Sequence, residues 1–165
     1  MIDVSGFGLK ATIVALQSFP MGFTVQQFAD DVDPLEVQDD VPGAYEMMYD
    51  GSLFAYTQAN PILVKISVLP GSEDDVNLKI LLASRRMANK LLPISDVTSM
   101  VISYPDGGKS IFSNGSIISG PPADSIKQEG RKKGNSYLFA FGNSTGAQNT
   151  KQIASEVIQG IAGLF

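Results

Sequence analysis

The segment PGSEDDVNLKILLASRRMANKLLP, residues 70–93, is the one long stretch of this sequence with the pattern of an α-helix. Ser72 is a favourable N-cap residue, and the three acids that follow it lie where the helix dipole favours negative charge. Two arginines and a lysine occupy the last turns, where positive charge is favoured, and Pro93 ends the pattern. This charge polarity predicts a helix over about residues 72–90.

The apolar residues of this segment recur with a helical period. Val76, Ile80, Ala83 and Met87 are spaced by four, three and four residues, with Leu81 beside them. Such a stripe is typical of a helix that packs one face on another layer of structure. We therefore expect this stripe to be buried against a sheet.

Outside the helix, the sequence consists mainly of short runs that alternate or are rich in β-branched residues, as strands do. We predict strands at residues 11–18, 23–28, 44–49, 53–58, 62–69, 98–104, 110–119 and 136–142. Asp50-Gly51, between two of them, is the strongest hairpin signal in the chain. The pattern predicts a mainly β fold, an antiparallel β-barrel or sandwich of short strands with one packed α-helix. At 165 residues, a single domain over 1–165 is expected.

Two of the predicted strands have clearly different faces. In the last strand, one face carries the aromatic residues Tyr137, Phe139 and Phe141. In strand 62–69, the face expected to meet the core carries Ile62, Val64, Ile66 and Val68. Lys65 and Ser67 then lie on the opposite face, where a sheet meets a second surface.

The composition limits the function. Charged residues make up 18% of the chain and hydrophobic residues 44%, which suggests that partner subunits cover part of the surface. Cys and His are both absent, which excludes thiol and Ser-His catalysis and zinc or haem sites built from these residues. We expect that the protein is not an enzyme and that it binds no cofactor and no metal. A net charge of −5 argues against binding nucleic acid by charge. No secretory or membrane-spanning segment is apparent, so we expect assembly inside a cell.

The segment FADDVDPLEVQDD, residues 28–40, is unusually acidic. Its carboxylates belong to Asp30, Asp31, Asp33, Glu36, Asp39 and Asp40. A calcium loop of the EF-hand type needs Gly at its sixth position and Glu at its twelfth, but counting from Asp31 these are Glu36 and Pro42. A calcium-dependent β-sandwich binding module remains the alternative from another functional class.

A short basic stretch complements this acidic segment. Residues 127–133 contain four bases, Lys127, Arg131, Lys132 and Lys133, with Glu129 as the only acid. We expect the acidic segment to form a projecting loop that meets this basic stretch on a neighbouring subunit or on the next ring of an assembly. The alternative is a flexible, solvated loop.

Three phrases, in this order, resemble the tail tube proteins of contractile-tailed bacteriophages and, more distantly, the stacked-ring tubes of type VI secretion. They are VLPGSEDDVNLKILLASRRMANK, VISYPDGGKSIFSNGSIISGPP and GRKKGNSYLFAFG. The likeness covers roughly residues 10 to 142 and includes no active-site fingerprint.

This resemblance implies a β-barrel-like subunit with one packed helix that closes into hexameric rings. Rings stack into a tube, and their inner strands line a channel through which DNA passes without specific binding. Tail sheath, baseplate or initiator, and tape-measure proteins are the implied partners. The expected place is the virion tail, after assembly in the host cytoplasm. Lys65 and Ser67 are expected in the lumen or at a subunit seam. A tube-initiator or baseplate protein, or a secretion-tube ring protein, is the alternative role for the same fold.

Overall fold

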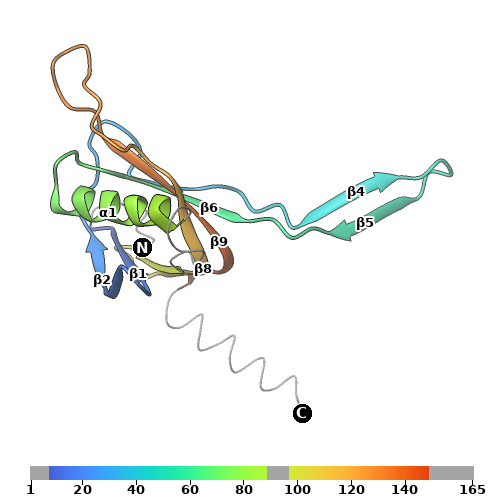
Figure 1. Cartoon of the computed structure of the whole chain (residues 1–165). Coiled ribbons are helices and arrows are strands. Elements are labelled where there is room, and N and C mark those ends of the chain that lie inside the picture. The colour runs from blue at the N-terminus through green and yellow to red at the C-terminus, as the bar shows by residue number, and fades with distance from the viewer. Residues whose placement is uncertain (1–7, 89–96, 149–165) are drawn as a thin grey trace.

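Antiparallel strands dominate the computed structural model, which describes residues 8–88 and 97–148 (Figure 1). The strands are β1 (Lys10–Ala15), β2 (Phe19–Val25), β3 (Leu35–Val37), β4 (Gly43–Met47), β5 (Leu53–Thr57), β6 (Ile62–Val68), β7 (Thr98–Ser103), β8 (Lys109–Ser119) and β9 (Asn135–Gln148). Helix α1 (Glu73–Ala88) lies between β6 and β7 in the chain. The predicted mainly β fold with one packed helix is confirmed for the described residues. The C-terminal segment 152–165 lies outside them.

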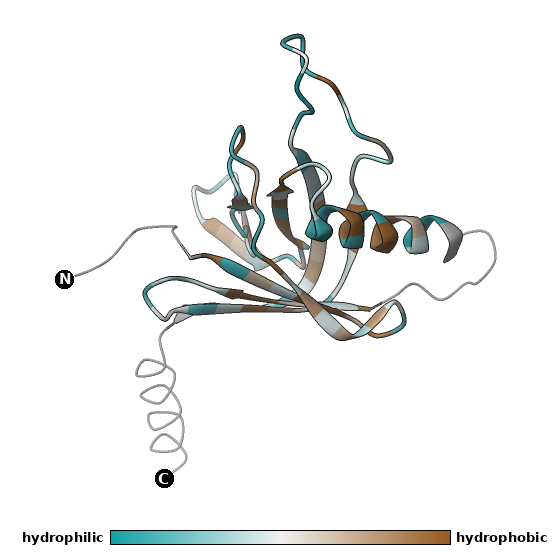
Figure 2. Ribbon diagram, turned by 90° about the vertical axis from the view of Figure 1, so that its left-hand side faces the viewer, coloured by the Kyte–Doolittle hydropathy of each residue, from teal (hydrophilic) through white to brown (hydrophobic). Residues whose placement is uncertain are grey.

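Most of the strands form one seven-stranded sheet in the order β2-β1-β7-β8-β9-β6-β3. Every neighbouring pair in this sheet is antiparallel. Its two longest strands, β8 and β9, pair near its middle. The sheet is strongly bent, and helix α1 lies along its inner side, in contact with β2 and β8 (Figure 2).

The core lies between the helix and this inner side of the sheet. The three aromatic residues of β9, Tyr137, Phe139 and Phe141, are all buried, as their alternation predicted. On β6, Val64, Ile66 and Val68 are buried, and Ile62 packs against them half-buried. These two strands pair directly, so their inward faces form one continuous apolar surface.

The predicted buried stripe of α1 is wrong. Val76 and Ile80 are 50% and 49% exposed, and Ala83 is exposed as well, while the side chain of Met87 lies outside the described part. The helix instead buries a different set of residues, Asp74, Asp75, Leu78, Leu81 and Leu82. Apolar spacing alone predicted a buried face that starts at Val76. The face that is buried starts instead with Asp74 and Asp75, because both carboxylates accept hydrogen bonds from the body of the protein.

Ser67 also differs from expectation. It lies on the face of β6 opposite the core, as predicted, but it is only 1% exposed. The chain before β3 lies beside it, since Ala29 N donates to Ser67 O at 3.0 Å and Ser67 N donates to Pro34 O at 3.0 Å, and its hydroxyl lies 2.8 Å from Ser136 Oγ. The single chain thus leaves almost none of this side chain in solvent, and its placement in a lumen or at a seam stays a prediction. Lys65 is exposed, so its placement there stays a prediction.

Strands β4 and β5 form a separate two-stranded sheet that projects from the body (Figure 1). We call residues 42–58 the arm. Asp50-Gly51 makes its turn, as predicted, with Gly51 at a φ of +86° that favours glycine. The Asp50 carboxylate accepts hydrogen bonds from Ser52 N at 2.9 Å and from Ser52 Oγ at 2.6 Å. At the base of the arm, Gln58 N donates to Pro42 O at 2.6 Å.

The orientation of α1 can be tested with a matched pair of truncations. Leu78→Ala removes a fully buried side chain and should lower the free energy of unfolding by about 2–5 kcal/mol. Ile80→Ala, on the outer face, should change it by no more than about 0.5 kcal/mol. Urea denaturation followed by circular dichroism measures both values. Equal destabilisation by the two variants would contradict the observed orientation.

Candidate assembly interface

The arm exposes an unusual number of large apolar side chains. They are Tyr45, Met47, Met48, Tyr49, Leu53, Phe54 and Tyr56. Monomeric soluble proteins rarely leave such a contiguous apolar surface in water, and where they do it commonly marks a contact with another molecule.

Both faces of the arm are apolar. The strand register places Tyr45, Met47 and Leu53 on one face, because residues directly opposite each other share a face. Phe54 and Tyr56 lie on the other face, with their ring centroids 5.8 Å apart. An isolated two-stranded hairpin is marginally stable in water. The arm therefore has the sequence of an element that is stabilised by burial against other molecules.

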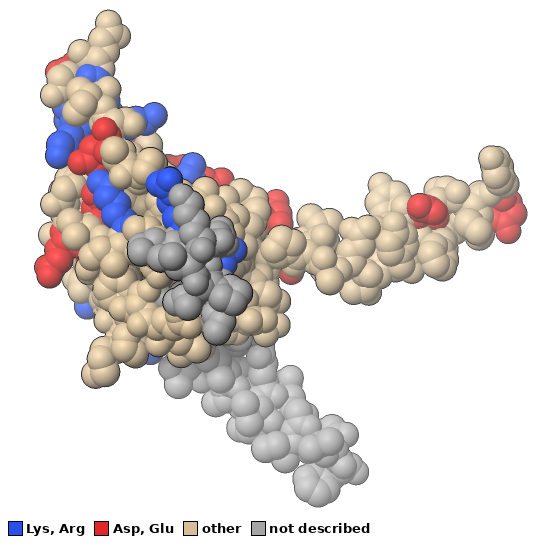
Figure 3. Space-filling view, in the orientation of Figure 1, with Lys and Arg blue, Asp and Glu red and all other residues tan. Residues whose placement is uncertain are grey.

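The charges of the chain are segregated between the arm region and the body. Residues 33–60 contain six acids and no base, a formal charge of −6, whereas the remaining residues contain 11 acids and all 12 bases. Figure 3 shows the same division, with Lys and Arg gathered on the body and none on the arm. The projecting arm itself holds two of these acids, Glu46 and Asp50, and no base, beside its exposed apolar side chains.

The acidic and basic segments meet, as predicted, but within one chain. Lys127 Nζ lies 2.8 Å from Asp31 Oδ2, and Arg131 pairs with Asp30. The hydrogen bond from Lys127, with a second from Gly134 N, lowers the pKa of Asp31 to about 2. In the single chain these two pairs close the loop on its own body, and the expected contact between subunits stays a prediction.

The other predicted contact residues divide into two groups. Lys132 pairs with Asp124 of its own chain at 3.1 Å. Asp33, Glu36, Asp39, Asp40 and Lys133 are exposed and form no ion pair within residues 8–88 and 97–148. Their contact with a neighbouring subunit stays a prediction.

The calcium alternative finds no support in the fold. Within the two described ranges, no three or more acids come together as ligands for a metal ion. In this same part of the chain, α1 does not meet the length and apolarity of a membrane-spanning helix.

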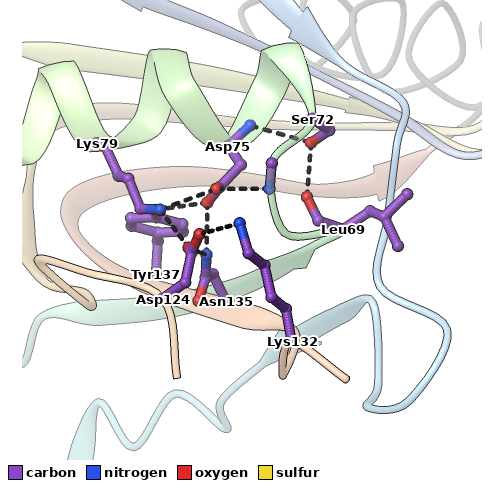
Figure 4. A network of polar contacts seen from close by, with 9 residues as sticks. Leu69, Ser72, Asp75, Lys79, Asp124, Lys132, Asn135 and Tyr137 are labelled. Atoms are coloured by element: carbon purple, nitrogen blue, oxygen red, sulfur yellow. Dashed lines mark hydrogen bonds and ion pairs between the residues drawn. The ribbon is translucent and has the colours of Figure 1, made fainter. Parts of the chain in front are cut away.

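The buried carboxylate of Asp75 anchors α1 to the sheet (Figure 4). It accepts hydrogen bonds from Tyr137 Oη at 2.8 Å, Asn135 Nδ2 at 2.9 Å, Gly71 N at 3.1 Å and Lys79 Nζ at 3.1 Å. Burial by itself would raise the pKa of Asp75, but the hydrogen bonds from Asn135 and Tyr137 outweigh it and hold the pKa below its usual value.

Asp124 extends this network to the loop before β9. It pairs with Lys79, with Lys132 at 3.1 Å and with Asn135 Nδ2 at 2.9 Å, which together hold its pKa well below the usual range. Sequence analysis missed this network. A tyrosine among the core positions of β9 was the available signal, because a buried tyrosine hydroxyl needs a hydrogen-bond partner.

Helix α1 presents a second apolar surface to solvent. Val76, Ile80 and Ala83 follow one another at the spacing of a helix face, and all three are exposed. Beside them lies a small pocket of about 80 Å³, lined by Lys79, Leu82, Ala83, Arg86, Pro121 and Pro122. We call the three exposed residues and this pocket the helix face.

Comparisons with known proteins show a likeness to parts of phage tails and contractile injection systems. A family model described as tail fiber protein gp32 matches residues 2–145. The PVC sheath/tube terminator of an extracellular contractile injection system, in its extended state, has a similar structure with a TM-score of 0.55 at 12% identity. The match covers 88% of this chain and 96% of that one. A chain of the anti-feeding prophage (AFP) baseplate matches with a TM-score of 0.49 at 10% identity, over 88% of this chain and 95% of that one. No curated protein sequence matches.

The Asp31–Lys127 pair should make stability depend on pH. Because the folded pKa of Asp31 is lowered to about 2, the pair stabilises the fold fully above the unfolded pKa of about 3.9, and this stabilisation is lost as pH falls through the folded value. Lys127→Gln should therefore be less stable than the wild type at about pH 7, and the difference should vanish near about pH 2. Lys133→Gln removes an exposed, unpaired lysine and is the control. Urea midpoints across this pH range test the prediction, and a difference that does not change with pH would contradict it.

Proposed function

The chain belongs to the tail fiber protein gp32 family, and from that membership we propose that it is a structural subunit of a contractile phage tail that assembles with copies of itself. The proposal includes the finer role of a tail tube subunit, which forms stacked hexameric rings around the channel for DNA ejection. Tail sheath, baseplate or initiator, and tape-measure proteins are the partners that this role entails.

The observation that carries the proposal is the arm. It exposes large apolar side chains on both faces, it contains no cation, and it projects away from the rest of the described chain. Burial of such a hairpin by neighbouring molecules removes apolar surface from water and supplies the stability that two strands lack alone. In an assembly this apolar surface is buried between subunits. In a protein that stays monomeric it would promote aggregation.

The charge balance supports the tube role. A channel lined by many basic groups would hold DNA through its phosphates, since every neutralised phosphate adds to the affinity. A chain with a net charge of −5 suits a conduit through which DNA must slide. The sequence has no Cys or His, and the buried Asp75 serves the network described above, so we propose that the protein is not an enzyme.

A fibre subunit is the second candidate, because the description of the family names a tail fiber protein. The two roles differ in the shape of the assembly. Negative-stain microscopy of the purified protein separates them: stacked rings or tubes support the tube subunit, isolated rings an initiator or terminator, and thin rods without a channel the fibre. A protein that stays monomeric at every concentration and salt condition would contradict all of these roles.

The requirement for the arm can be tested with Met47→Ser combined with Leu53→Ser. These residues face each other across the two strands beside the turn, so the double change removes the outer end of one apolar face without changing the charge. The body should keep the thermal unfolding midpoint of the wild type, while assembly in microscopy and sedimentation is lost. Met21→Ser with Ile126→Ser, two exposed apolar residues of the body, is the matched control and should assemble.

A further inference from the structure

The helix face is an apolar surface that the described residues, 8–88 and 97–148, leave partly open to solvent. Val76 and Ile80, in the first half of α1, are each about half exposed, at 50% and 49%. The network around Asp75 holds α1 in this orientation, so the helix cannot turn these residues inward without breaking it. The apolar stripe on its outer side is therefore a fixed feature of the folded chain.

The C-terminal end of the helix that carries this stripe is basic, whereas Glu73 lies at its start. Arg85 and Arg86 lie in the last turns of α1 and pair with no acid in the described part of the chain. Arg86 also lines the pocket beside the stripe, together with Pro121 and Pro122. An occupant that fits must bring apolar side chains for the stripe and acidic groups for the arginines.

The arm has this complementary chemistry. Its tip carries Met48 and Tyr49 next to Asp50, and Glu46 lies on the same hairpin as the apolar residues. A tyrosine ring is also a partner for an arginine guanidinium, whose cation–π contact adds to the burial of the ring. No cation on the arm opposes its approach to the helix face.

The arm cannot reach the helix face of its own chain. Figure 1 shows the arm directed away from the body on the side opposite α1. We propose that the arm of one copy docks on the helix face of a second copy, with the Met48–Asp50 tip over Ile80 and the pocket lined by Arg86. This inference rests on the self-assembly proposed above and names the two surfaces that carry it.

The contact is heterologous, because the arm and the helix face are different parts of the chain. Each copy then offers one arm and one helix face, so the contact can be repeated by every subunit. Heterologous contacts of this kind close into rings when the rotation between copies allows it, and otherwise continue as filaments.

The absence of Cys from the chain allows a direct test. A Met48→Cys protein and an Ile80→Cys protein that carries a size tag are mixed under assembly conditions and oxidised mildly. A disulfide requires the two Cα atoms to come within about 7 Å of each other, so the mixed disulfide reports docking of the arm on the helix. Met48→Cys mixed with Ile126→Cys, which is exposed on the basic loop, is the matched control.

The mixed disulfide should form between Met48→Cys and Ile80→Cys and be absent from the control pair. Equal crosslinking in both pairs, or only arm-to-arm disulfides, would overturn the inference. Rings or tubes that form without a Met48–Ile80 crosslink would overturn it too, while leaving the proposed function intact. Permanent monomers would overturn both.

A second variant separates folding from docking. Ile80→Asp puts a charge in the middle of the apolar stripe but on an exposed position, so the monomer should keep the unfolding midpoint of the wild type. The concentration needed for assembly should rise about tenfold or more, as for the loss of one central contact residue. Assembly at the wild-type concentration would overturn the inference.

Discussion

The carboxylate of Asp75 joins three parts of the chain in one set of hydrogen bonds. Its donors are Gly71 before the helix, Lys79 on the helix, and Asn135 and Tyr137 at the start of β9. A buried charge is tolerated only when its partners satisfy it, and the loss of one partner commonly costs about 3–5 kcal/mol. This requirement fixes the rotation of α1 about its own axis. It thereby decides which apolar residues enter the core and which remain outside for other molecules.

Most of the fold could be predicted from local patterns, because alternation and turn residues report directly on strands. The aromatic face of β9 and the Asp50-Gly51 turn are examples, and the polarity of charges along α1 located the helix. The rotation of the helix could not be predicted, since it depends on the donors that Asn135 and Tyr137 supply from about 60 residues away in the sequence. The burial of Ser67 could not be predicted for a similar reason, because residues 29–34 pair with its backbone from another part of the chain and leave no periodic signal.

The charge pattern of the sequence indicated which segments attract each other, but not the arm. Complementary charge correctly paired Asp30 and Asp31 with the basic stretch, but charge alone does not tell a contact within a chain from one between chains. The hairpin was expected, whereas its isolation from the main sheet was not, since strand patterns do not say which sheet a strand will join. The chain thus combines a body with its own core and an arm that lacks one.

The absence of any base between residues 33 and 60 has a consequence for copies that are not yet assembled. Each such copy exposes a hairpin whose edge strands are unpaired. Exposed edge strands can pair with strands of other molecules and cause aggregation. Because every arm carries two acids, Glu46 and Asp50, and no base, two arms that approach each other repel, and the repulsion is strongest at low ionic strength. The acids that suit a basic docking site therefore have a second effect. They reduce aggregation of unassembled subunits through their arms.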